Sequence, residues 1–136
     1  MKALIATALC LASQLALADM VVIAHPSSPI SSLPQSQLSR LFLGQTNAFP
    51  DGSRAVPLDV EGEQRTRFYR EVLKRQPDQL EKYWARMIFT GKAQPPREVK
   101  SRDVKSLVAE TPGAISYLDK SQVDGSVKVI RIDSGS

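Results

Sequence analysis

Residues 56–69 read VPLDVEGEQRTRFY. A short, largely apolar run, which predicts a strand over 54–60, passes within a few residues into acids, a glycine and a helical pattern. The predicted helix, residues 61–75, has acidic residues early and Lys74-Arg75 late, an arrangement that complements the helix dipole. The junction indicates an α/β fold. It is either an anion-binding helix start or a charged, solvent-exposed turn.

The flanking sequence continues this alternation of strands and helices. Apolar or alternating runs predict further strands over 20–24, 114–119 and 127–132, the last with its valines and isoleucines on one face. Helices are predicted from Ser32 to Gly44, where Ser32 and Gln35 have capping-box spacing, and over 77–89 and 101–110. The 77–89 helix has the strongest apolar periodicity, and we expect Trp84 to lie in the core. The pattern predicts a three-layer α/β/α single domain with a mixed sheet.

The first 18 residues predict a cleaved secretory signal peptide. Met1-Lys2 is followed by a short apolar run, and Ala16-Leu17-Ala18 has the small-x-small form of a signal peptidase site. The predicted domain is therefore residues 19–136, exported to the periplasm and free of cysteine, because Cys10 lies in the leader. The net charge of +4 comes from basic residues interleaved with acids. This mixture does not predict a nucleic-acid interface.

Enzyme motifs are few. His25 is the single histidine, and the sequence has no P-loop, dinucleotide fingerprint, G-x-S-x-G elbow or H-E-x-x-H zinc motif. A catalytic role would need His25 as a base with Asp59 or Glu61 as its partner. We therefore predict a non-enzyme, with no cofactor and no metal.

Two predicted strand-to-helix junctions are candidate binding loops. Ligands collect at the carboxyl ends of strands in open α/β sheets, and helix N-termini favour anions. The loops after the first and second strands supply the candidate ligand-binding residues Ser27, Ser28, Gln64, Arg65 and Thr66. Three acids in the second junction (Asp59, Glu61 and Glu63) would repel a dianion, so a capped helix start without ligand remains the alternative.

Three segments resemble the phosphate ABC transporter substrate-binding family, and more closely its short single-domain bacterial relatives. They are LSRLFLGQTNAFPDGSRAVPLDV (38–60), YWARMIFTGKAQPP (83–96) and TPGAISYLD (111–119). The resemblance covers most of residues 19–136. It implies the fold of one lobe of a type 2 periplasmic binding protein. It also implies phosphate or another small oxyanion as ligand and an ABC permease as partner.

Two departures from the family pattern bear on binding. Full-length members close two lobes around phosphate, whereas this chain has the length of one, so a second protomer in a homo-dimer is one source of the remaining contacts. The family's arginine and Ser-Gly-Thr-Thr helix start is replaced by Gln64-Arg65-Thr66-Arg67, and the arginine position falls near Val60. Two hypotheses follow. One is an exported solute-binding protein that holds an oxyanion at the helix start. The other is a non-transport interaction or accessory module with another envelope protein as partner, which keeps the fold and has lost phosphate binding.

Overall fold

A mixed six-stranded sheet forms the centre of the computed structural model, which describes residues 19–134. The strands are β1 (Met20–Ala24), β2 (Ser32–Pro34), β3 (Val56–Val60), β4 (Arg97–Val99), β5 (Ala114–Asp119) and β6 (Lys128–Asp133). Their order across the sheet is β2-β6-β1-β5-β3-β4. The predicted signal peptide lies outside the described residues. Within residues 19–134, no helix combines the length and apolar character needed to cross a bilayer.

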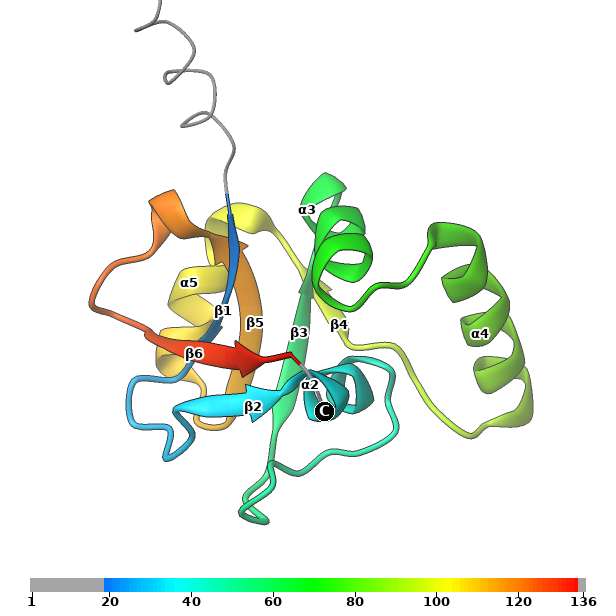
Figure 1. Ribbon diagram of the computed structural model, residues 1–136, viewed down its shortest axis with the longest axis horizontal. Helices are drawn as coiled ribbons and strands as arrows, with labels where there is room; N and C mark the ends of the chain where they lie inside the picture. Colours follow the sequence, from blue (N-terminus) through cyan, green and yellow to red (C-terminus); the bar gives the residue numbers. More distant parts are fainter. Residues whose placement is uncertain (1–18, 135–136) are drawn as a thin grey trace, which may run out of the picture.

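Strand direction fixes which loops share an edge of the sheet. β1 is antiparallel to both of its neighbours, β5 and β6. β3 is parallel to β5 and to β4, and β2 is parallel to β6. The carboxyl ends of β3, β4 and β5 therefore meet at one edge, and the carboxyl end of β1 lies at the opposite edge (Figure 1).

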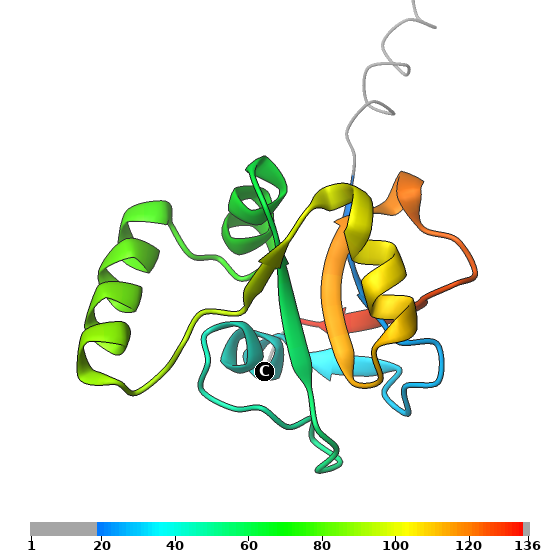
Figure 2. The ribbon, with the colours of Figure 1, turned by 180° about the vertical axis from the view of Figure 1, so that it is seen from behind.

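Helices cover both faces of the sheet. On one face lie α2 (Gln35–Phe42) and the continuous helical segment made of α3 (Glu63–Arg67) and the π-helical turn η2 (Phe68–Val72). On the other face lies α5 (Ser101–Glu110), as the two opposite views show (Figures 1 and 2). A 3₁₀ turn, η3 (Lys120–Gln122), follows β5. This arrangement confirms the predicted three-layer α/β/α domain with a mixed sheet.

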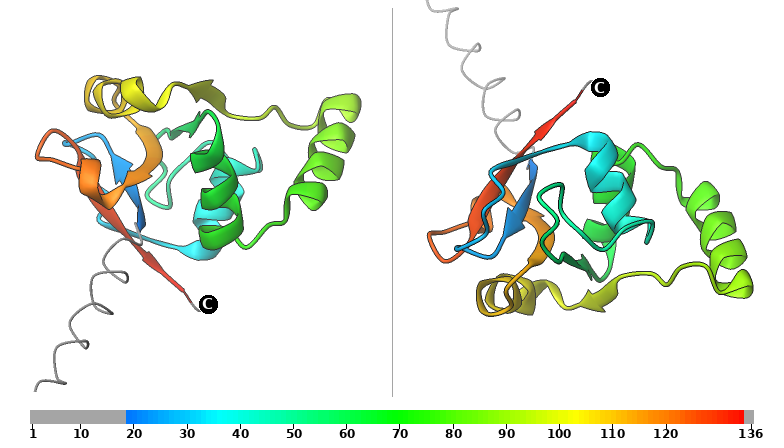
Figure 3. Two further views of the ribbon diagram at one scale, coloured as in Figure 1. Left: turned by 90° about the horizontal axis from the view of Figure 1, so that it is seen from above. Right: turned by 90° about the horizontal axis from the view of Figure 1, so that it is seen from below.

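One helix stands away from these layers. α4 (Pro77–Thr90) lies to the side of the sheet and is joined to the body by a loop at each end (Figure 3). Its first half attaches it: Leu80 and Trp84 are buried, and the Tyr83 hydroxyl donates a 2.6 Å hydrogen bond to the Leu43 carbonyl. The left-handed Gly91, with φ +71°, caps its end.

A cluster of four aromatic rings joins the helices to the sheet beneath them. Phe68 of η2 stacks on Tyr117 of β5 with ring centroids 3.9 Å apart. Phe42 of α2 meets Phe68 edge-on at 5.0 Å, and Tyr69 packs against both phenylalanines. Such pairs stabilise a core beyond their buried area. The cluster therefore holds η2, and with it α3, at the carboxyl end of β3.

Two local predictions are wrong in ways that tertiary structure explains. Ser32 does not cap a helix: residues 32–34 form β2 along β6, and α2 begins at Gln35. Pairing with β6 buries Leu33, and the residue before a proline favours an extended backbone. In β6, Val129 is 48% exposed and shares the outer face with Arg131, because side chains alternate strictly along a strand.

Candidate functional site

The structure separates the five candidate ligand-binding residues into two groups. Ser27 and Ser28 follow β1, whereas Gln64, Arg65 and Thr66 belong to α3, which follows β3. Because β1 and β3 run in opposite directions, the two groups lie at opposite edges of the sheet (Figure 1). One chain therefore does not bring the two groups together around a single ligand. Anion binding by either group remains a prediction.

The loop after β1 is held by local contacts. The Ser27 hydroxyl lies 2.9 Å from His25 Nδ1, and the Ser28 hydroxyl accepts a hydrogen bond from the backbone amide of Ile30 at 3.2 Å. An open cleft of about 410 Å³ adjoins this loop, and Ser53 and Arg54 are also among its lining residues. The serines thus support a turn.

The most unusual group at the other edge is Asp59, which the sequence analysis considered as an acid that repels an anion and as a possible partner of His25, but not as the centre of a buried site. Its side chain is 0% exposed near the end of β3. The Tyr69 hydroxyl lies 3.0 Å from each of its carboxylate oxygens, and the Tyr117 hydroxyl lies 2.9 Å from Oδ1. Arg65 Nε donates to Oδ2 at 3.3 Å. β3, α3, η2 and β5 all contribute to this one site.

Burial and hydrogen bonding oppose each other at this carboxylate. Burial raises the pKa of Asp59 to about 6, while the charge of Arg65 and hydrogen bonds from Tyr117 and Tyr69 act to lower it. Burial, and then the charge of Asp59, raise the pKa of both tyrosines. Burial, the largest single effect, acts to lower the pKa of the Arg65 guanidinium, but the charge and hydrogen bond of Asp59 and the charges of Tyr69 and Glu98 together outweigh it, so this pKa is raised. Near neutral pH the site therefore holds an ionised Asp59 with two protonated tyrosines and a charged arginine.

This arrangement changes what the start of α3 offers to an anion. The Asp59 carboxylate already neutralises Arg65, whose guanidinium also lies 4.8 Å from the centre of the Tyr69 ring. Gln64 donates its side-chain amide to the Ser101 hydroxyl at 3.1 Å, which ties α3 to α5. Of the three predicted residues in α3, only Thr66 is exposed. The structure therefore places an internal carboxylate beside the arginine that an oxyanion would use.

A cleft of about 560 Å³ opens beside this site, between η2 and α4. Its walls carry both signs of charge. The lining residues include Arg65, Thr66, Arg75, Asp78, Glu81 and Trp84. Trp84 Nε1 is buried and has no hydrogen-bond partner among the described residues. The cleft is large enough for a small solute, and its acids make it a poor match for a dianion.

Sequence reasoning missed Asp59, Tyr69 and Tyr117 as a group. One signal was present: Asp59 interrupts an otherwise apolar strand, VPLDV, where a charged residue needs a partner if the strand is buried. The partners themselves were not visible, because Tyr117 lies 58 residues away along the chain.

Comparisons with known proteins find solved structures with a similar fold. No family model matches the chain, and no curated protein sequence matches it. Among solved structures, it is similar to a protein from Clostridium perfringens assigned as a phosphate ABC transporter substrate-binding protein and solved with bound phosphate. The TM-score is 0.64 at 23% identity, over 85% of this chain and 45% of that one. An ABC-type phosphate transport receptor from Vibrio cholerae gives a TM-score of 0.62 at 20% identity, over 85% and 46% of the two chains.

A third similar structure, PstS from Borrelia burgdorferi, has a TM-score of 0.64 at 10% identity, over 88% of this chain and 49% of that one. The chain thus spans about half the length of each of these structures. Identities this low establish a shared fold only. The resemblance inferred from the sequence is confirmed at that level: the chain has the fold of phosphate ABC transporter substrate-binding proteins, in a single lobe-sized domain.

Proposed function

We propose that the chain is an exported, periplasmic protein that acts in the cell envelope as a binding or interaction component, related to the phosphate-binding component of an ABC transporter. The fold shared with substrate-binding proteins supports this proposal and agrees with a role other than catalysis. The predicted signal peptide supports the periplasmic location.

The geometry best supports an accessory or interaction module that keeps this fold without holding phosphate at the start of α3. One observation carries this conclusion. The buried carboxylate of Asp59 accepts hydrogen bonds from the Arg65 guanidinium and from the hydroxyls of two tyrosines, so the positive charge of Arg65 is already neutralised within the protein. A phosphate dianion at Arg65 would approach a like charge that has no access to solvent, and screening there is weak. The role would then lie in contacts with another envelope protein.

A second candidate function is that of an oxyanion receptor that serves an ABC permease. The bound phosphate in the Clostridium perfringens structure, which has the same fold, favours it. In this case Arg65 and Thr66, which line the 560 Å³ cleft, would contact the oxyanion together with the neighbouring Gln64. Ser27 and Ser28 lie at the opposite edge, so they would have to come from a second protomer of a homo-dimer.

Calorimetric titration with phosphate, against sulfate and chloride at matched ionic strength, separates the two functions. We expect no saturable heat from the wild-type protein at millimolar phosphate. If phosphate binds saturably and Thr66→Ala or Arg65→Glu weakens that binding, the protein is an oxyanion receptor, and the proposal of an accessory module without phosphate binding is overturned. Arg102→Glu is the matched control, because it makes the same charge change at an exposed position of α5.

A further inference from the structure

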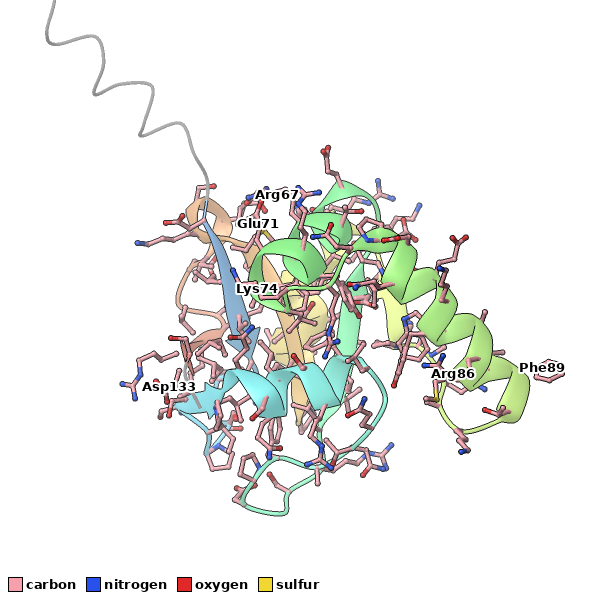
Figure 4. The ribbon with its side chains drawn as sticks, turned by 45° about the vertical axis from the view of Figure 1, so that its right-hand side comes forward. Arg67, Glu71, Lys74, Arg86, Phe89 and Asp133 are labelled. Carbon is pink, nitrogen blue, oxygen red and sulfur yellow. The ribbon has the colours of Figure 1, made fainter. Side chains whose placement is uncertain are left out.

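The last turn of α4 leaves large apolar side chains in solvent. Phe89 is 90% exposed and Ile88 is 48% exposed. Figure 4 shows Phe89 projecting from the end of the helix that stands away from the sheet, with Arg86 on the preceding turn. Isolated exposed hydrophobic residues are common, but an adjacent pair at the end of a projecting helix marks a candidate contact surface.

The helix presents this end rigidly. Its first half is fixed by the buried Leu80 and Trp84 and by the 2.6 Å hydrogen bond from Tyr83 to the Leu43 carbonyl. The capping glycine, Gly91, ends the helix directly after its exposed turn. The apolar end is therefore part of a folded element, held outside the body of the domain (Figure 3).

The charge around this end has one sign. Residues 82–92 read KYWARMIFTGK, with three cations and no acid. Among residues 19–134, no salt bridge engages Lys82, Arg86 or Lys92. The acids of α4, Asp78 and Glu81, lie in its first two turns.

We propose that the end of α4 docks on an anionic phospholipid surface, with Phe89 and Ile88 inserted among the lipids and Lys82, Arg86 and Lys92 facing the headgroups. Unpaired cations beside exposed aromatic and aliphatic side chains are the features by which amphipathic helices bind anionic membranes. This docking requires no bound solute, so it does not depend on either candidate function.

Shape and charge favour a lipid surface over a protein. Two exposed apolar residues on a convex end present far less area than the roughly 800 Å² that each partner buries in a stable protein interface. A deformable lipid surface accepts such a small, convex end without a matching pocket. A second copy of the chain is disfavoured, because residues 19–136 carry 17 basic and 14 acidic residues, a net positive charge on each copy.

Vesicle co-sedimentation tests the proposal on residues 19–136, whose described part contains the complete sheet and core. We expect the protein to bind vesicles that contain phosphatidylglycerol and to bind neutral phosphatidylcholine vesicles much more weakly. Binding to the anionic vesicles should fall as salt rises, because the cations are exposed. Phe89→Ser should weaken it on the order of tenfold or more, since the inserted ring is lost. Val129→Ser, at an exposed apolar residue of β6, is the matched control and should not change binding.

Each outcome decides the proposal. Phe89 is exposed, so Phe89→Ser should leave the fold intact, and a thermal melt of each variant checks this. No binding of wild-type protein to anionic vesicles, or equal losses in Phe89→Ser and Val129→Ser, would overturn the proposal. A homo-dimer seen by light scattering that only Phe89→Ser dissociates would also overturn it, because the apolar end would then belong to a protein interface.

Discussion

Replacing Asp59 by asparagine should change how the stability of the protein depends on pH. Burial raises the pKa of Asp59 from 3.8 to about 6 in the folded protein. The folded state therefore binds this proton more tightly than the unfolded state, and the free energy of unfolding should fall as pH rises from about 4 to about 6. The pKa difference of about 2 pH units corresponds to about 3 kcal/mol, at ~1.4 kcal/mol per unit. Because the side chain is 0% exposed, we apply no reduction for solvent screening.

Urea unfolding of wild type and Asp59→Asn at several pH values between 4 and 7 measures this effect. Carboxylates elsewhere titrate equally in both proteins, so the difference in unfolding free energy isolates Asp59. We expect that difference to shift by about 2–3 kcal/mol in favour of the asparagine variant as pH rises. A constant difference, or one that favours wild type at higher pH, would refute the reasoning. It would mean that Arg65, Tyr117 and Tyr69 fully offset, or more than offset, the cost of burying the charge.

Four further substitutions test the backbone and the buried network by urea unfolding at neutral pH. Lys74 has a left-handed backbone with φ 61°, so Lys74→Gly should stabilise the protein by about 1 kcal/mol, and a loss of stability would contradict this. Gly113→Ala would place a Cβ atom 2.6 Å from the Arg54 carbonyl oxygen at φ +84° and should cost about 2 kcal/mol or more. Gly52→Ala, at φ +89° with open space around it, should cost only about 1 kcal/mol. If the two alanine variants lose the same stability, the contact between the Cβ atom at residue 113 and the Arg54 carbonyl oxygen must be relieved by a shift of the backbone. Tyr117→Phe removes one of the hydrogen-bond donors to the buried Asp59 carboxylate and the acceptor of the Val60 backbone amide, so it should cost about 1–3 kcal/mol, and an unchanged stability would show that the bonds do not form.

Elements with a strong local pattern could be predicted from the sequence. The strands predicted at 20–24 and 114–119 and the helix predicted at 101–110 appear with those bounds, and the helix predicted at 77–89 runs one residue further, to Thr90. β2 and β4 could not be predicted, because each has three residues and exists through its pairing with a neighbouring strand. β4 pairs with β3, and its sequence, REV, has no apolar pattern that would predict a strand.

The candidate site was harder to predict, because strand direction and side-chain partners are tertiary properties. Ser27 and Arg65 both follow strands, and only the antiparallel placement of β1 shows that they lie at opposite edges. The role of Asp59 depends on Tyr69, ten residues away, and on Tyr117 in another strand. An acid within an apolar strand indicated that partners were needed and did not identify them.

The most direct test of the central claim is a thermal melt of the protein with and without millimolar phosphate at matched ionic strength. A ligand at about a hundred times its dissociation constant stabilises by ~2.7 kcal/mol, which for a domain of this size raises Tm by on the order of ten degrees. If the Asp59 carboxylate occupies the place of an oxyanion beside Arg65, phosphate should leave Tm unchanged. A rise with phosphate, absent with sulfate and chloride, would contradict the account and identify an oxyanion receptor.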